Sequence, residues 1–204
     1  MKLFLFDFDG VLVDSLDVYE KTVTDCLIKI NQPLTRGREE FLELFEGNFY
    51  ESLVKKGVDL DAFLKASVDI LAQVNFKDIK PMDAVVPVVR ELQKNHCLIV
   101  VSSNDSASIK EALELFHYDG YFREILGSDF MFSKKEKIIY ATKKYQVRPR
   151  NIYYIGDTTG DIKEGREAGV KTVGITWGWH SKEKMAAAKP DYLFDAPQEL
   201  LQLN

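Results

Sequence analysis

The stretch Leu3-Phe4-Leu5-Phe6-Asp7-Phe8-Asp9-Gly10 places two carboxylates at the end of a short apolar run. Such a run is typical of a strand buried on both faces, as in a parallel sheet. Asp7 and Asp9 are two residues apart and therefore project to the same side of that strand. Two unpaired charges would repel each other there, so we expect a cation between them or a proton on one of them. An ordinary Asp-Gly turn is the alternative for one aspartate alone, but a pair at a strand end favours a ligand site.

Five further apolar runs alternate with helical patterns along the chain. The six runs are Leu3–Phe8, Leu98–Val101, Ile125–Leu126, Ile152–Ile155, Val173–Ile175 and Tyr192–Phe194. Strands that alternate with helices form βαβ units around a parallel sheet. The sequence therefore predicts an α/β fold whose core is a Rossmann-like parallel sheet.

One region, residues 16–80, interrupts this alternation. It contains no convincing strand, and its apolar residues fall on helical stripes, for example Leu16, Tyr19 and Val23. We predict an all-helical cap domain at residues 16–80. It would be inserted into a core domain that is formed by residues 1–15 and 81–204.

A second acidic cluster, Gly156-Asp157-Thr158-Thr159-Gly160-Asp161, begins where another apolar run ends. Carboxylate oxygens gathered at one sheet edge suit Mg²⁺, which takes hard oxygen ligands and keeps several waters. The alternative for Asp161 is that it only caps the following helix. That alternative is compatible with a metal at Asp157.

Two weaker signals lie between the acidic clusters. The run that ends at Val101 continues into Ser102-Ser103-Asn104, whose hydroxyls and backbone amides could hold phosphate oxygens or simply cap a helix. Lys134 and Lys135 precede a predicted helix, where a cation opposes the helix dipole and an anionic partner would explain it. A solvated surface pair is the alternative for these lysines.

Composition and charge exclude several classes of protein. The chain has 204 residues with 27 basic and 32 acidic side chains, so no basic excess indicates a nucleic-acid partner. Its two cysteines, Cys26 and Cys97, lie in apolar-periodic segments and are expected to be small buried hydrophobes in a reducing compartment. The first apolar run is too short for a signal sequence or a membrane span. We expect a cytoplasmic protein without a membrane partner.

These motifs together resemble those of the haloacid dehalogenase-superfamily hydrolases. The matching segments are Asp7-Phe8-Asp9-Gly10-Val11-Leu12, the end of the strand at Ser102, Lys134, and Gly156-Asp157-Thr158-Thr159-Gly160-Asp161. The resemblance covers nearly the whole chain, including a helical cap of the C1 type between the first two motifs. The segments Thr176-Trp177-Gly178-Trp179 and Ala188–Asp195 resemble more narrowly the phosphoglycolate-phosphatase-like branch.

The resemblance implies roles for the catalytic residues. Asp7 would be the nucleophile that forms an aspartyl-phosphate. Asp9 would protonate the leaving alkoxide and then take a proton from the water that attacks the intermediate. Lys134 would offset negative charge. Lys135 is the alternative, because the family's lysine is commonly followed by Pro or Gly, whereas Lys134 is followed by a second lysine.

It also implies a cofactor, Mg²⁺, that would bridge the Asp7 carboxylate, the Asp9 backbone carbonyl, Asp157 and the phosphate. Asp161 would be a metal ligand or would hold a metal-bound water. Positioning and charge neutralisation are the main catalytic factors in phosphoryl transfer.

Substrate binding is expected from two places. Ser102, Ser103 and Asn104 would hold phosphoryl oxygens. In the cap, Asn48 and Tyr50 follow a glycine between two helical patterns, a position that resembles the specificity loop of C1 relatives. Packing of Tyr50 inside the cap is the alternative for that residue.

The predicted function is Mg²⁺-dependent hydrolysis of a small phosphorylated metabolite, a phosphoglycolate-like ester, through an aspartyl-phosphate. A β-phosphoglucomutase-like phosphosugar mutase and a pyrophosphatase use the same motifs and remain alternatives. Outside the enzymes, the alternative is a phospho-accepting signalling module of the receiver type, whose acceptor aspartate would lie on a later, central strand. The sequence predicts a small-molecule phosphate ester as partner and gives no oligomeric state.

Overall fold

A computed structural model describes residues 1–74, 78–118 and 120–204 of the chain. The main sheet contains six parallel strands in the order β5-β4-β1-β6-β7-β8. They are β1 (Leu3–Phe6), β4 (Cys97–Val101), β5 (Glu124–Leu126), β6 (Ile152–Gly156), β7 (Lys171–Ile175) and β8 (Tyr192–Phe194). Every apolar run of the sequence overlaps one of these strands, so the predicted α/β class is confirmed. The first run is shorter than predicted, because β1 ends at Phe6 and Asp7 follows it.

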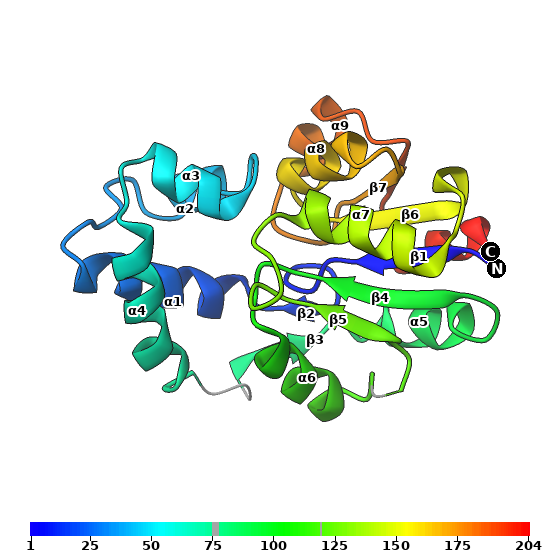
Figure 1. The fold of residues 1–204 in the computed structure, drawn as a ribbon, viewed down its shortest axis with the longest axis horizontal. Helices are drawn as coiled ribbons and strands as arrows, with labels where there is room; N and C mark the ends of the chain where they lie inside the picture. Colours follow the sequence, from blue (N-terminus) through cyan, green and yellow to red (C-terminus); the bar gives the residue numbers. More distant parts are fainter. Residues whose placement is uncertain (75–77, 119) are drawn as a thin grey trace.

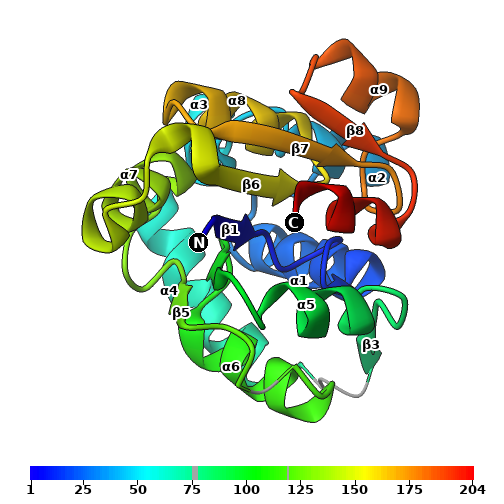
Figure 2. The same cartoon turned by 90° about the vertical axis from the view of Figure 1, so that its right-hand side faces the viewer.

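Helices cover both faces of the sheet, as the continuous apolar strands require (Figures 1 and 2). Along β1, Phe4 and Phe6 pack into the hydrophobic cluster on the α5 and α6 face, whereas Leu3 and Leu5 pack into the cluster on the α7 face. The core helices are α5 (Val86–Leu92), α6 (Ser106–Leu115), α7 (Lys134–Tyr145), α8 (Thr159–Glu167) and α9 (Lys182–Ala187), with 3-10 turns η2 (Pro149–Asn151) and η3 (Pro197–Leu203).

Four helices between β1 and α5 form a separate layer at one end of the molecule, on the left of Figure 1. They are α1 (Leu16–Lys29), α2 (Arg38–Glu43), α3 (Phe49–Lys55) and α4 (Leu60–Leu71), called the cap helices below. They share a hydrophobic cluster of their own, which includes Leu27, Phe41 and Leu53. Residues 75–77 of the predicted cap lie outside the described part of the chain.

The two segments that join the cap helices to the core pair with each other. β2 (Val13–Asp14) and β3 (Lys80–Pro81) form a two-stranded antiparallel ribbon. The sequence predicted a boundary between cap and core at these places but no strand, because a two-residue strand is too short to show a periodicity. Pairing holds the two crossings side by side, so the chain enters and leaves the cap helices at one narrow place.

The strand order brings three of the predicted motifs together. Counted along the chain, the six parallel strands lie in the order 3-2-1-4-5-6, and ligands bind such sheets where the order reverses. The reversal lies at β1, which has β4 and β6 as its neighbours. Asp7, Ser102 and Asp157 each follow one of these three strands directly, and they therefore meet at the same edge.

Candidate active site

Asp7, Asp157 and Asp161 lie close together at one edge of the sheet, called the acidic edge below. Asp7 is almost fully buried there. Its Oδ1 accepts a hydrogen bond from the Phe8 amide at 2.7 Å, and its Oδ2 accepts one from Lys134 Nζ at 2.7 Å. The pKa of Asp7 is raised to about 7, because burial and the Asp161 and Asp9 charges together outweigh the effect of Lys134. The nucleophile predicted from the sequence is therefore paired with a cation.

Lys134 reaches the acidic edge from the first turn of α7, a helix capped by the Ser133 side chain. Its Nζ contacts Asp7 Oδ2 and Asp161 Oδ1, both at 2.7 Å. Burial opposes the charge of Lys134, but the Asp161 and Asp7 carboxylates outweigh burial and hold its pKa above the ordinary value. The Lys135 Nζ points elsewhere and pairs with Glu167 at 3.3 Å. Of the two candidate lysines, only Lys134 therefore contacts the acidic edge.

Asp157 is completely buried, and backbone packs tightly around its carboxylate. Gly10 has a φ of +76°, and a Cβ there would lie 2.1 Å from Asp157 Oδ2, so no side chain fits. The same oxygen accepts a hydrogen bond from the Trp179 amide at 2.6 Å. Asp157 Oδ1 is buried and has no hydrogen-bond partner among the described residues. Burial and the negative charges of Asp161 and Asp7 raise the pKa of Asp157 well above its ordinary value.

Asp161 has hydrogen-bond donors on both oxygens. Its Oδ1 accepts from Lys134 Nζ and Tyr154 Oη, each at 2.7 Å. Its Oδ2 accepts from the Thr158 amide at 3.1 Å and the Thr158 hydroxyl at 2.6 Å, which completes a capping box at the start of α8. Burial raises the pKa of Asp161, but Lys134, Thr158 and Tyr154 outweigh burial and lower it. Asp161 is therefore both the helix cap considered in the sequence analysis and a partner of Lys134.

The acidic edge fits a divalent cation. One carboxylate oxygen from each of Asp7, Asp157 and Asp161 lies within 4.8 Å of the other two. The cluster holds three carboxylates against the single ammonium of Lys134, and the partnerless Asp157 Oδ1 is the kind of hard donor that Mg²⁺ takes. The Asp9 side chain is not part of this group of oxygens.

Asp9 has surroundings of its own. Its Oδ1 accepts a hydrogen bond from Ser15 Oγ at 2.7 Å. Burial raises the pKa of Asp9 to about 6, and Ser15, Lys134 and Asn104 limit the rise. A carboxyl group with this pKa can both donate and accept a proton near neutral pH, as a general acid and base must.

The residues predicted to bind phosphate form a tight turn after β4. Ser102 Oγ is buried and accepts a hydrogen bond from the Asn104 amide at 3.0 Å. Ser102 and Ser103 line a cavity of about 10 Å³ together with Asp7, Asp9 and other residues of the acidic edge. Asn104 lines a second small cavity together with Asp9, and its side chain lowers the pKa of Asp9.

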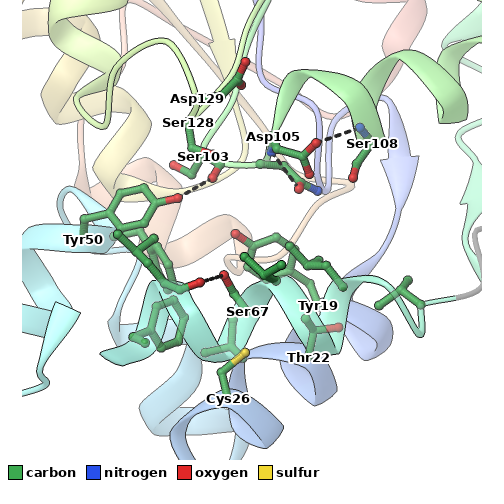
Figure 3. Close-up of a pocket in the computed structure, with 18 of the residues that line it drawn as sticks. Tyr19, Thr22, Cys26, Tyr50, Ser67, Ser103, Asp105, Ser108, Ser128 and Asp129 are labelled. Atoms are coloured by element: carbon green, nitrogen blue, oxygen red, sulfur yellow. Dashed lines mark hydrogen bonds between the residues drawn. The ribbon is translucent and has the colours of Figure 1, made fainter. Parts of the chain in front are cut away.

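The two predicted cap residues lie at the interface between the cap helices and the core. Asn48 caps α3 by accepting from the amides of Tyr50 and Glu51, and its Nδ2 donates to Phe132 O and Glu164 Oε1. Tyr50 Oη donates to Ser103 O at 2.8 Å (Figure 3). The Asn48 amide is thus fully engaged by protein groups, and Tyr50 directly joins the cap helices to the turn at Ser102–Asn104.

Lys137, one turn after Lys134, was not predicted as a site residue because a lysine on a polar helix normally indicates a solvated face. It is fully buried, and its Nζ donates to Ser102 O at 2.5 Å. Burial and the neighbouring Lys134 charge lower the pKa of Lys137 from 10.5 to about 7. Lys137 therefore holds the backbone of the turn at Ser102–Asn104 in place.

This buried lysine should make stability depend on pH. Its folded pKa lies below its unfolded pKa, so between pH 7 and 10 the unfolded chain binds more protons and the free energy of unfolding rises with pH. We expect Lys137→Met to lose this rise, which amounts to at least about 1 kcal/mol between pH 7 and 9. Urea unfolding of both proteins at several pH values measures it. Parallel stability curves would show that Lys137 keeps an ordinary pKa.

The fold and the site define a class, capped α/β proteins with an acidic active site at the reversal point of the sheet. The family model described as haloacid dehalogenase-like hydrolase matches residues 4–175, and the chain belongs to this family. The family resemblance stated from the sequence motifs is thereby confirmed, and the protein is a hydrolase of the phosphatase type.

Individual relatives agree with this assignment. A phosphoglycolate phosphatase from Haemophilus influenzae is 27% identical over 222 residues, covering 99% of this chain and 97% of that protein. One from Aquifex aeolicus is 28% identical, with coverages of 100% and 96%. A solved structure of a predicted phosphatase from Clostridium acetobutylicum has a TM-score of 0.85 at 22% identity, with coverages of 98% and 96%. That structural likeness supports the fold.

Two expectations about the surroundings of the protein can be compared with the structure. In the described part of the chain, no helix combines the length and the apolarity needed to cross a bilayer. Cys26 and Cys97 are free thiols, the first buried in the cap helices and the second half-buried on β4.

Proposed function

We propose that this protein hydrolyses a small phosphate monoester with Mg²⁺ and through an aspartyl-phosphate on Asp7. The observation that carries the proposal is a buried cluster beneath the cap helices: Asp7 and Asp161 both contact Lys134, and an Asp157 oxygen lies within 4.8 Å of an oxygen of each aspartate. Carboxylates and one lysine in this arrangement can bind a metal, attack phosphorus and neutralise the charge of a phosphoryl group.

In the first step the Asp7 carboxylate attacks phosphorus, and Asp9 gives its proton to the departing alcohol oxygen. In the second step Asp9 takes a proton from water, which attacks phosphorus and releases phosphate from Asp7. Ser102 Oγ, the amides that follow it and Lys134 Nζ would hold the phosphoryl oxygens. The pKa of Asp9, about 6, supports both of its roles.

Asp7, Asp157 and the Asp9 carbonyl would hold Mg²⁺, which would neutralise charge that otherwise repels the attacking carboxylate. The donors on both oxygens of Asp161 favour a role in which this residue positions Lys134 and holds a water near the metal.

Residues 16–80 would act as the cap domain and residues 1–15 and 81–204 as the core domain. Tyr19 and Phe45 of the cap and Trp179 of the core line the cavity at Asp7. At about 10 Å³ that cavity holds no more than one water, so it must widen to admit a phosphoryl group. Closure over a bound ester would exclude bulk water during transfer. We propose a cytoplasmic location for this activity.

The test is a phosphate-release screen over a panel of phosphate esters, with Mg²⁺ or with excess EDTA. Phosphoglycolate is the reference ester, since it is what the names of the relatives indicate. We expect Mg²⁺-dependent release of phosphate from at least one alkyl ester. Return of the phosphoryl group to a sugar would identify the mutase alternative, and a stable phosphoprotein without turnover would identify the signalling alternative.

Metal binding should depend on Asp157. We expect Asp157→Asn to raise the Mg²⁺ concentration for half-maximal activity more than about tenfold, because an amide oxygen is a weaker ligand than a carboxylate. Mg²⁺ should raise the thermal midpoint of the wild type and of the exposed control Asp195→Asn, but not that of Asp157→Asn. Full activity in excess EDTA, or an unchanged Mg²⁺ response in Asp157→Asn, would contradict the assignment.

A further inference from the structure

A cleft of about 900 Å³ lies between the cap helices and the core, beside the acidic edge (Figure 3). Tyr19 and Ser103 line both this cleft and the small cavity at Asp7 and Asp9. A second small cavity, of about 20 Å³, is lined by Asp9, Tyr19 and Asn104, and the last two again line the cleft. When a phosphoryl group lies at Asp7 and its bridging oxygen at Asp9, the alcohol part of the ester therefore extends into the cleft.

The two walls of the cleft differ in chemistry. The wall formed by α1, α3 and α4 is largely apolar, with Val23, Phe49, Phe63, Leu64 and Leu71. The core wall presents the hydroxyl-bearing residues Ser103, Ser108 and Ser128 (Figure 3). An occupant that matches both walls has apolar surface on one side and neutral hydrogen-bonding groups on the other.

The charged residues that line the described part of the cleft are all acidic. Asp105, Glu111 and Asp129 line it, and none of its described lining residues is lysine or arginine. Burial raises the pKa of Asp129, but hydrogen bonds from the Ser106 hydroxyl and amide outweigh burial and hold it below the ordinary value. A carboxylate on the ester's alcohol part would therefore lose water and meet negative charge without a compensating cation.

We propose that the cleft selects phosphate esters of uncharged, partly apolar alcohols larger than glycolate, and discriminates against esters whose alcohol part carries a carboxylate. The inference rests on the phosphatase function proposed above and names its class of substrate. A cleft of this size lies in the range of about 300–1,000 Å³ that is typical of small-molecule sites, and glycolate would fill little of it.

Two matched pairs of esters test charge and size separately. The first is phosphoglycolate against 2-phosphoglycolamide, in which an amide replaces the carboxylate without a change of shape. The second is ethyl phosphate against 2-phenylethyl phosphate, which adds apolar surface alone. We expect kcat/KM to be at least tenfold higher for the amide than for the carboxylate, and at least tenfold higher for the phenylethyl ester than for the ethyl ester.

A charge variant connects the discrimination to the cleft. Asp105→Asn with Asp129→Asn keeps the acceptor oxygens that hold Ser108 and Ser106 but removes two negative charges. This double variant should lower the amide-to-carboxylate ratio at least threefold. Glu114→Gln removes one charge from an exposed position on α6 outside the cleft, and it should leave the ratio unchanged.

The failure of this inference differs from failure of the proposed function. p-Nitrophenyl phosphate, whose activated leaving group places little demand on the cleft, reports the phosphatase chemistry itself. Turnover of that ester combined with equal or faster hydrolysis of phosphoglycolate than of the amide would overturn the inference and leave the phosphatase intact. An unchanged ratio in the double variant would also overturn it. Without turnover of any ester in Mg²⁺, both the function and the inference fall.

Discussion

Asp7→Asn is expected to abolish turnover, lowering kcat by at least about 10⁴-fold, because an amide is a poor nucleophile and cannot form the aspartyl-phosphate. The variant should nevertheless fold. Burial raises the pKa of Asp7 to about 7, so between pH 4 and 7 the folded protein binds more protons than the unfolded chain, and stability falls as pH rises. Above pH 7 the charged carboxylate therefore destabilises the folded protein. Without metal, the Asp7→Asn variant, which carries a neutral amide, should be at least as stable as the wild type.

Phosphate release and thermal unfolding of the same preparation measure both effects. Asp61→Asn, on the exposed face of α4, is the matched control and should retain wild-type activity. Phosphate release by Asp7→Asn near the wild-type rate would remove Asp7 from the nucleophile role. Loss of both activity and folded structure would instead assign Asp7 a structural role, against the pH argument.

The sheet could be predicted because burial on both faces produces continuous apolar runs. The predicted site residues could be placed at its edge for the same reason, since Asp7, Ser102 and Asp157 each lie at or just beyond the end of a run. Which strands become neighbours is decided by the crossovers, and the sequence shows these only as helical patterns. That the three strand ends carrying these residues lie side by side, with β1 in the middle, is therefore visible only in the fold.

Other features of the site could not be predicted, because the sequence does not show which partner each group meets in the fold. Lys137 is separated by 35 positions from the carbonyl that it holds. The Trp179 amide contacts Asp157 across a gap of 22 residues, and a backbone amide leaves no mark in the sequence. Tyr154 has the appearance of one more apolar strand residue, although its hydroxyl donates to Asp161. In each case the residue type permits an ordinary structural role, and only its partner gives it a place in the site.

The contacts of Asn48 could not be predicted from the sequence for a third reason. The glycine and the aromatic residues around it indicate a loop, and loops over an active site commonly carry specificity. In the structure the Asn48 side-chain amide does two things: its oxygen caps α3, and its nitrogen donates to groups of the core. Asparagine is a favoured cap for physical reasons that have nothing to do with a substrate.

Asp9→Asn is expected to slow hydrolysis of alkyl phosphate esters by about 10²–10⁴-fold, since one carboxyl group serves first as acid and then as base. Asparagine keeps an acceptor for Ser15 Oγ, so the loss measures proton transfer and not packing. The dependence on leaving group provides the sharper readout. With an activated aryl ester the leaving oxygen needs no proton, so formation of the aspartyl-phosphate should survive in Asp9→Asn. Its hydrolysis, which still needs a base, should become the slow step, and phosphoprotein should accumulate as a burst.

In the wild type, the pH profile of kcat/KM for an alkyl ester should show an ionisation near pH 6, the value to which burial raises the pKa of Asp9. The first step needs protonated Asp9, so kcat/KM should fall as pH rises through this value, and Asp9→Asn should lose that limb. Asp14→Asn, an exposed neighbour on β2, should keep both the rate and the profile. A change of less than threefold in Asp9→Asn with an alkyl ester would contradict the assignment. Equal losses of kcat/KM with alkyl and aryl esters would show that Asp9 positions the phosphoryl group without transferring a proton to the leaving oxygen.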